Sequence, residues 1–360
     1  MIATGPWYAP WMGPEGLPHT GWGVVLAGAA AAAVVLLLVP LLRRIAWWTG
    51  YLDHPEARKL HTHATPLLGG VAVAAGVFVA AALAVARMQA PVPPAAFWWA
   101  AGALAALALG LWDDRFGMRP GLKLAVQFCV AGLFFLGGVF PAAGLPDWVG
   151  VALGLFWLVA MMNAVNFLDN MDGIVGGMSA ILAAGLGILL FSWGRQAEAL
   201  IAFSLAGAAA TYLYFNFPPA SIFLGDTGSL FLGYSLGALS LVAAAAGPDI
   251  EGSVAGLLIL GYPVFDLCFV VVTRIRDGRK IYQGGKDHTT HRLNTIVRGP
   301  RRTAVGIYAC AAALTASGVG VAAAHGFHQT LPWLLAWALA LTAFGLRLAR
   351  VPVKHAAPGV

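Results

Sequence analysis

The chain has 360 residues, of which 60% are hydrophobic and 10% are charged, and its mean hydropathy is +0.79. Soluble domains carry about 25% charged residues, so this composition excludes an ordinary soluble domain and indicates a protein that crosses a membrane several times. The net charge of +6 comes from basic residues scattered over short loops, without a basic arm, which argues against nucleic-acid binding.

Apolar runs between polar or Pro/Gly breaks predict an all-α, polytopic integral membrane protein, with one membrane domain over residues 1–360. A spanning helix needs about 20 apolar residues, and a helix satisfies its own backbone hydrogen bonds in lipid. The sequence predicts about eleven transmembrane helices, at 22–47, 67–86, 96–112, 121–140, 147–165, 174–193, 197–216, 228–247, 252–273, 303–324 and 330–348.

The distribution of Lys and Arg predicts the orientation of these helices. If residues 48–66 face the cytoplasm, 19 of the 21 Lys and Arg residues lie on the cytoplasmic side, and only Arg87 and Arg195 lie outside. The positive-inside rule then places the N-terminus outside and the C-terminus in the cytoplasm. The cytoplasmic segments expected to form the active-site loops are 48–66, 113–121, 166–173, 217–228 and 274–302.

The first of these loops and the end of the third span carry charged residues. Lys59 lies in loop 48–66, where a basic loop on the membrane surface is an equally good interpretation. Asp113 and Asp114 end the third span, and Lys123 follows just inside the fourth. This pattern suits a phosphate and its metal ion, but it also fits a solvated helix end with a positive-inside lysine.

The segment NAVNFLDNMDG, residues 163–173, ends an apolar run with five polar residues. Asn163, Asn166, Asp169 and Asp172 are each three residues apart, so on a helix they would form one drifting stripe. Polar groups within a membrane are costly, and ending a helix needs only one or two of them. A functional site is therefore the preferred interpretation.

A Pro-rich break in FNFPPASIFLGDTGSLFLGY precedes Asp226 at the start of the eighth span. Asp226 or Thr227 would cap this helix. Because a helix start also binds anions, Asp226 could hold Mg²⁺ against a bound phosphate there. Phe223 lies close enough in sequence to offer a flat face to a base.

The largest cytoplasmic loop, 274–302, is strongly basic, and most of its basic residues are expected to face solvent and lipid headgroups. His288, His291 and Arg292 stand apart from them. The H-x-x-H spacing lacks the further ligands and the glutamate of zinc sites. A cationic cluster that binds phosphates is therefore the better interpretation.

Five segments occur in order between about residues 50 and 300: DHPEARKLHTHATPLLGG, DDRFGMRPGLKL, NAVNFLDNMDG, FLGDTGSLFLGY and GGKDHTTHRL. Together they resemble the polyprenyl-phosphate N-acetylhexosamine-1-phosphate transferases. The resemblance implies transfer of N-acetylhexosamine 1-phosphate, with GlcNAc 1-phosphate preferred, from a UDP-sugar to undecaprenyl phosphate, releasing UMP. It also implies dependence on Mg²⁺ or Mn²⁺, an active site on the cytoplasmic face of the plasma (inner) membrane, and a role in the first membrane step of cell-envelope glycopolymer synthesis.

The resemblance also implies roles for particular residues. Asp226 would bind Mg²⁺, together with Asn166. Asp113, Asp114 and Lys123 would be catalytic, the two acids near the lipid phosphate and Lys123 on the pyrophosphate.

The remaining expected substrate contacts are Lys59, Asn166, Asp169, Asp172, Phe223, His288, His291 and Arg292. Of these, Phe223 would stack on uracil, and Asp169 and Asp172 would lie by the nucleoside or the metal. The sugar phosphate would be held by His288, His291 and Arg292. Asn170 departs from the glycine expected after Asp169, which affects the local turn and substrate preference.

Two alternatives stay open. The ending H-x-x-H-R resembles the N-acetylglucosamine-type members, whereas phospho-MurNAc-pentapeptide transferases carry consecutive histidines; activity of that second type is the alternative within the family. A transporter of a phosphorylated solute is the alternative from another class, although no internal repeat supports it. Some members of the family form dimers, so a homodimer is a further expectation.

Overall fold

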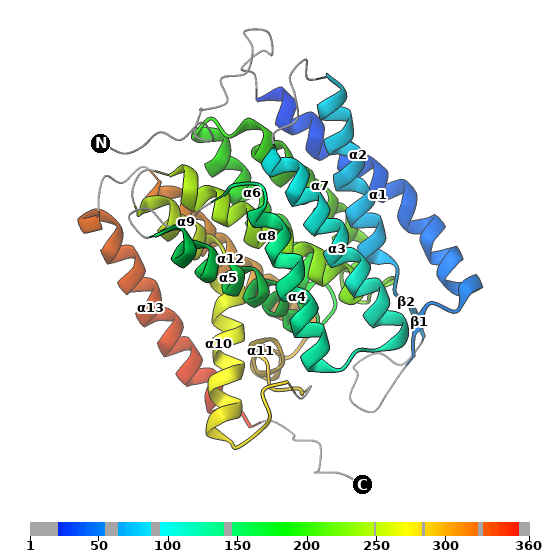
Figure 1. Ribbon diagram of the computed structural model, residues 1–360. Helices are drawn as coiled ribbons and strands as arrows, with labels where there is room; N and C mark the ends of the chain where they lie inside the picture. The colour runs from blue at the N-terminus through cyan, green and yellow to red at the C-terminus, as the bar shows by residue number, and fades with distance from the viewer. Residues whose placement is uncertain are drawn as a thin grey trace, which may run out of the picture.

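The computed structural model describes residues 21–54, 64–87, 94–139, 146–247, 250–282, 285–322 and 327–352. Lys59 lies outside these residues. The helices are α1 Trp22–Thr49, α2 Gly69–Arg87, α3 Pro94–Phe116, α4 Pro120–Phe135, α5 Asp147–Leu168, α6 Ile174–Ser192, α7 Gln196–Asn216, α8 Gly225–Ala246, α9 Glu251–Ile259, α10 Gly261–Arg276, α11 Thr289–Val297, α12 Pro300–Val321 and α13 Phe327–Ala349 (Figure 1). The all-α prediction is confirmed apart from two short antiparallel strands, β1 Leu52–Asp53 and β2 Thr65–Pro66.

The number of spans differs from the prediction of about eleven. In the described part of the chain, nine helices are long and apolar enough to cross a membrane, namely α1, α2, α3, α5, α6, α7, α8, α12 and α13. The pair α9 and α10 makes up to ten if it is counted as one broken span. Helix α4 covers the predicted span at 121–140 but has only 16 residues.

The helix predicted at 252–273 is not continuous. It breaks at Leu260, where α9 and α10 meet at an angle of 69°. Pro263 lies in the first turn of α10, where its missing N–H costs no helical hydrogen bond, whereas within one long helix it would remove one. The loop predicted at 274–302 also differs, because it contains the nine-residue helix α11.

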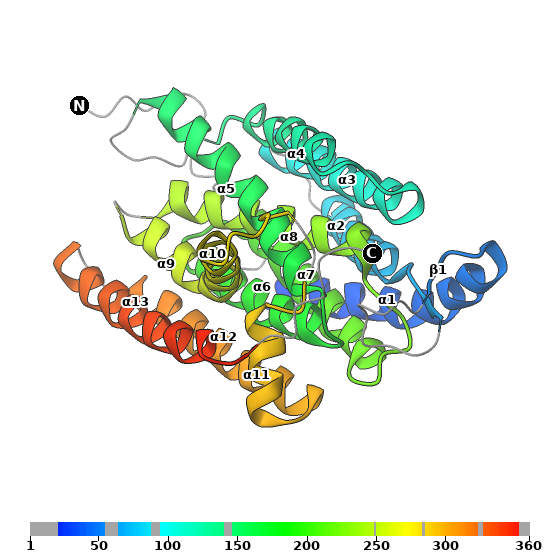
Figure 2. The same cartoon turned by 90° about the horizontal axis from the view of Figure 1, so that it is seen from below.

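Helix α8 lies at the centre of the bundle and contacts α2, α3, α5, α6, α7 and α9 (Figures 1 and 2). In its most apolar stretch 89% of the residues are buried, compared with 11% in α13 at the edge. Helices α1 and α13 lie on opposite sides of the bundle in both views. Because lipid provides little hydrophobic drive between helices, this arrangement depends on close packing of small residues.

Close backbone contacts fix the start of α8. The N–H groups of Gly69 and Gly70 donate to the carbonyls of Phe223 and Leu224, over 3.0 and 3.1 Å, so that α2 begins against α8. On the other side, a Cβ atom at Gly110 of α3 would overlap the backbone of Asp226 and Thr227. The first turn of α8 therefore has one position relative to α2 and α3.

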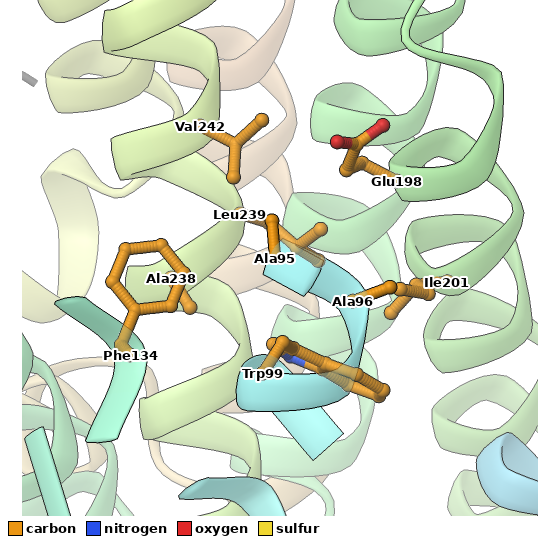
Figure 3. A pocket seen from close by; sticks show the side chains of 9 residues that line it. All are labelled: Ala95, Ala96, Trp99, Phe134, Glu198, Ile201, Ala238, Leu239 and Val242. Atoms are coloured by element: carbon orange, nitrogen blue, oxygen red, sulfur yellow. The ribbon is translucent and has the colours of Figure 1, made fainter. Parts of the chain in front are cut away.

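A small, mostly apolar pocket lies at the opposite end of the bundle. Side chains of α3, α4, α7 and α8 line it, among them Trp99 and Phe134 (Figure 3). Glu198 is the acidic residue in this lining, and it pairs with Arg195 one helical turn away. The polar groups that could perform chemistry lie at the other end of these helices.

Substitution of Gly110 by Ala should destabilise the protein. The added methyl group forces α3 away from the start of α8, and overpacking of this kind costs about 1–3 kcal/mol. Thermal unfolding in detergent micelles measures the loss. Gly132→Ala in α4 is the matched control, because nothing lies within 4 Å of its Cβ position; a Gly110→Ala protein as stable as this control would contradict the tight contact.

Candidate active site

Asp114 binds the start of α8. Its Oδ1 accepts the backbone N–H of Asp226 at 2.8 Å, and its Oδ2 accepts the backbone N–H and the hydroxyl of Thr227 at 3.0 and 2.6 Å. The sequence suggested that Asp226 or Thr227 caps α8, but neither side chain does so, because α8 begins at Gly225 and takes its cap from α3. Both oxygens of Asp114 are therefore occupied by the protein.

Asp226 is held in a polar group that we call the carboxylate cluster: Asp113, Asp114, Lys123, Asn166 and Asp226. The Lys123 ammonium lies 2.7 Å from Asp113 Oδ2 and 2.5 Å from Asp226 Oδ2. Asn166 donates from Nδ2 to Asp226 Oδ1 at 2.7 Å. The Asp226 side chain is 30% exposed, so it remains accessible to a ligand.

The stripe predicted over residues 163–172 follows the helix only in part, since α5 ends at Leu168. Within the helix, Asn163 donates to Gln127 at 2.8 Å, one turn deeper than Asn166. Beyond the helix, Asp172 accepts the backbone N–H of Ala220 at 2.9 Å and so holds the segment before α8 in place.

Asp169 lies just beyond the end of α5. Its burial, together with the negative charges of Asp226 and Asp114, raises the pKa of the Asp169 carboxyl well above its usual range. This group is therefore suited to carry a proton beside the carboxylate cluster.

Phe223, the expected base-stacking residue, is half-buried. Its carbonyl accepts the N–H of Gly69 at the start of α2.

A second group, the histidine cluster, consists of Asp266, His288, Thr289 and His291. Nδ1 of His288 lies 2.9 Å from Asp266 Oδ2, and Asp266 Oδ1 accepts the backbone N–H and the hydroxyl of Thr289 at 2.9 and 2.5 Å. Asp266 is fully buried in α10. It joins the broken span to the start of α11.

The end of α5 links the two clusters. Asn166 contacts Asp226, and the ring of the next residue, Phe167, packs edge-on against His288 with 5.7 Å between centroids. Asn170 accepts the Thr290 hydroxyl at 2.7 Å and donates to its own turn at Phe167 O over 2.6 Å. The residue that departs from the expected glycine thus ties the end of α5 to α11.

Asp287 anchors the loop before α11. Arg274, which is only 2% exposed, binds both of its oxygens at 2.8 Å, and Arg279 adds a contact at 2.7 Å. These arginines hold the pKa of the Asp287 carboxyl well below its usual range, despite its burial. A bidentate, buried pair of this kind fixes the loop and positions His288, the next residue.

Arg292 is placed differently from the prediction that it holds the sugar phosphate. Its guanidinium donates to the carbonyls of Leu348, Ala349 and Val351 at the end of α13, and it lies 5.3 Å from the ring centre of Phe269. The side chain is 4% exposed. Arg292 is on the face of α11 turned toward α13, so its charge serves the packing of that helix.

Asp266 lies within the run 252–273, which the sequence pattern predicts as one uninterrupted span, so the pattern does not single it out. An acidic residue in such a run, three positions after a proline, was the available signal, since ionisable groups in spans are rarely without a role. Ser229, which accepts from Asn166 Nδ2 at 2.9 Å, was also missed, as it reads as an ordinary helix residue.

The donor atoms of the carboxylate cluster fit Mg²⁺. Among the described residues, no three His, Cys, Asp or Glu side chains gather so that they could hold a metal alone. Asp226 and Asp113, with the amide oxygen of Asn166, would supply hard oxygen ligands. Mg²⁺ ordinarily takes one or two carboxylates and completes its shell with water and substrate phosphates. The contact of both acids with one ammonium shows that a cation is accommodated between them.

Substitution of Arg292 by Met should lower stability. Three carbonyls at the end of α13 would lose a charged donor, and bonds to charged groups contribute about 1.5–3 kcal/mol each. Thermal unfolding in detergent tests this. Arg302→Met, at an exposed arginine of α12, is the control; equal melting temperatures for the two variants would refute the anchoring role.

His291 should make the protein sensitive to acid. Burial lowers the pKa of His291 to about 4, from 6.5, and the neighbouring His288 contributes to this shift. Between these values the unfolded chain binds a proton that the folded protein does not, so stability falls as the pH is lowered, by about 3 kcal/mol in total. When unfolding is measured at several pH values, the stability of His291→Gln should fall less steeply with decreasing pH than that of the wild type. Parallel plots of stability against pH for the two proteins would contradict this prediction.

The chain resembles known transferases across most of its length. Residues 95–244 match glycosyl transferase family 4. It is 33% identical over 284 residues, 75% of this chain and 76% of the relative, to a protein of Bacillus subtilis named probable undecaprenyl-phosphate N-acetylglucosaminyl 1-phosphate transferase. It is 32% identical to decaprenyl-phosphate N-acetylglucosaminephosphotransferase of Mycobacterium tuberculosis, over 74% of each chain.

A relative from Escherichia coli, undecaprenyl-phosphate alpha-N-acetylglucosaminyl 1-phosphate transferase, is 28% identical over 81% of this chain and 82% of its own. The family match contains the whole carboxylate cluster. With 33% identity to a relative over 75% of its length, the chain belongs to glycosyl transferase family 4 and is a transferase.

Proposed function

We propose that this protein transfers N-acetylglucosamine 1-phosphate from UDP-N-acetylglucosamine to undecaprenyl phosphate and releases UMP. Support comes from the relatives from B. subtilis and E. coli, which are named as a probable undecaprenyl-phosphate N-acetylglucosaminyl 1-phosphate transferase and as an undecaprenyl-phosphate alpha-N-acetylglucosaminyl 1-phosphate transferase. The observation that supports it most directly is the carboxylate cluster: Lys123, Asp113 and Asp226 meet within 2.7 Å at the ends of three helices. The cluster combines carboxylates, which can bind a metal ion, with an ammonium group, which can bind phosphate. A diphosphate substrate needs both.

The proposal includes the location of the reaction. The positive-inside distribution of Lys and Arg supports an active site on the cytoplasmic face of the plasma membrane, where a nucleotide sugar would be supplied. The acceptor phosphate would reach the same site from the membrane, because the cluster lies at the ends of apolar helices.

In the proposed reaction an oxygen of the lipid phosphate attacks the sugar-bearing phosphorus. A new phosphorus–oxygen bond forms as the bond to the bridging oxygen breaks, and UMP leaves with that oxygen. A phosphate monoester has a second pKa of about 6, so it is largely dianionic at neutral pH and needs little help from a base. Positioning and charge neutralisation therefore supply most of the rate.

The residues divide this work. Lys123 would neutralise charge on the diphosphate, a role for which its ammonium is already directed into the cluster by Asp113. Asp114 would act indirectly, by holding the first turn of α8 and with it Asp226. His288 would bind the sugar phosphate, and Phe223 would stack on the uracil.

Mg²⁺ bound by Asp226 would supply Lewis-acid stabilisation of the negative charge that develops on the phosphate oxygens. Asn166 orients Asp226 for this purpose through its bond to Oδ1. In binding the metal, Asn166 would present its amide oxygen.

The assay mixes purified protein with UDP-N-acetylglucosamine, undecaprenyl phosphate and Mg²⁺, and measures UMP together with the lipid-linked product. We expect one UMP for each product molecule. A chelator should stop the reaction, and added Mg²⁺ should restore it. Binding of the nucleotide sugar without any UMP would reject the proposed function and favour a transporter or a different donor.

Asp226→Asn should lower turnover by about 1,000-fold or more, since a metal ligand contributes several kcal/mol to the reaction. Asp277→Asn is the matched control, because Asp277 forms an exposed ion pair with Arg276 at the end of α10. Near-normal turnover by Asp226→Asn at saturating Mg²⁺ would remove Asp226 from the site.

A further inference from the structure

Asp266 combines complete burial with three hydrogen bonds from the segment that begins α11. Its Oδ2 accepts from His288 Nδ1 at 2.9 Å, while its Oδ1 accepts from the N–H and the hydroxyl of Thr289. The two carboxylate oxygens thus have separate tasks. One holds the start of α11, and the other holds the imidazole.

The imidazole of His288 is fixed on more than one side. Phe167 packs edge-on against it at 5.7 Å, and the residue is 5% exposed. Asp287, directly before it, is clamped by Arg274 and Arg279. A carboxylate can only accept a hydrogen bond, so Nδ1 carries the proton and Nε2 is the nitrogen left for a ligand.

We propose that Asp266 is a positioning residue of the transfer reaction, which fixes the tautomer and the direction of the His288 ring so that Nε2 meets the sugar phosphate of the donor. The inference rests on the proposed function. It follows from the connection through α5: Asn166 binds Asp226, and Phe167, the next residue, packs on His288. Asp266 itself is fully buried and touches no substrate.

Asp266→Asn isolates this role. The variant side chain has the same shape, and its carbonyl oxygen can still accept both bonds from Thr289. Its amide, however, donates to Nδ1 and moves the neutral ring to the opposite tautomer, with the proton on Nε2. We expect kcat/KM to fall about 10- to 100-fold, as when an outer hydrogen-bond partner of a functional histidine is lost.

A double-mutant cycle shows whether Asp266 acts through His288. Asp266→Asn should change kcat/KM less than about threefold in a His288→Gln background, because residues that act as a unit are not additive. Full additivity of the two losses, or wild-type activity of Asp266→Asn, overturns the proposal. Wild-type protein that transfers no sugar phosphate at all would instead reject the proposed function.

The tautomer can be measured without turnover. In protein labelled with ¹⁵N-histidine, the His288 signals are identified by their loss in His288→Gln, and at alkaline pH the ring nitrogens report where the proton resides. Asp266→Asn should exchange the protonated and unprotonated nitrogens of this ring. Unchanged ¹⁵N shifts would overturn the inference even if activity fell.

Thr289→Val is the matched control. It removes the hydroxyl contact with Asp266 Oδ1 and the 3.1 Å contact with Tyr262 but leaves the bond to His288 in place. We expect lower thermal stability, while the His288 ring keeps the wild-type tautomer. If the His288 tautomer changed equally in Thr289→Val and Asp266→Asn, weaker attachment of α11 would explain the change in both variants. That result would contradict the proposal.

Discussion

The carboxylate of Asp114 caps the N-terminal amides of α8 from a neighbouring helix, and the position of Asp226 depends on this contact. A helix start within a membrane protein has N–H groups that neither lipid nor its own helix can satisfy. Asp114 supplies the acceptors, and Gly110 allows α3 to approach closely enough for it to do so. A requirement of backbone hydrogen bonding therefore fixes the position of the Asp226 carboxylate.

The end of α5 relates the two halves of the site. Asn166, Phe167 and Asn170 contact α8, His288 and Thr290 in turn, so one short segment touches both clusters. Through this connection, a ligand that moves side chains at one cluster would also move side chains at the other. It also gives Asn170 a structural purpose, which its departure from the expected glycine had left open.

The broken span α9–α10 serves the second cluster. A straight helix would carry Asp266 as an unpaired acid in the apolar layer, a costly arrangement. The bend of 69° and the loop that follows bring Asp266 to His288 and Thr289, which satisfy both of its oxygens. Irregular backbone within a membrane is tolerated where protein covers it.

By itself, the sequence determined the class of the fold and most polar segments of the site. Apolar runs of spanning length require helices, whatever their arrangement, and five polar residues at the end of one run, 163–173, are hard to explain without a function. Only the tertiary structure decided the tasks of individual side chains: Asp114 as the cap of α8, Arg292 as the anchor of α13, and Asp266 as the partner of His288. The physical reason is that a residue's task depends on which element lies opposite it. These contacts join residues 22 to 112 positions apart, and a local sequence pattern does not record them.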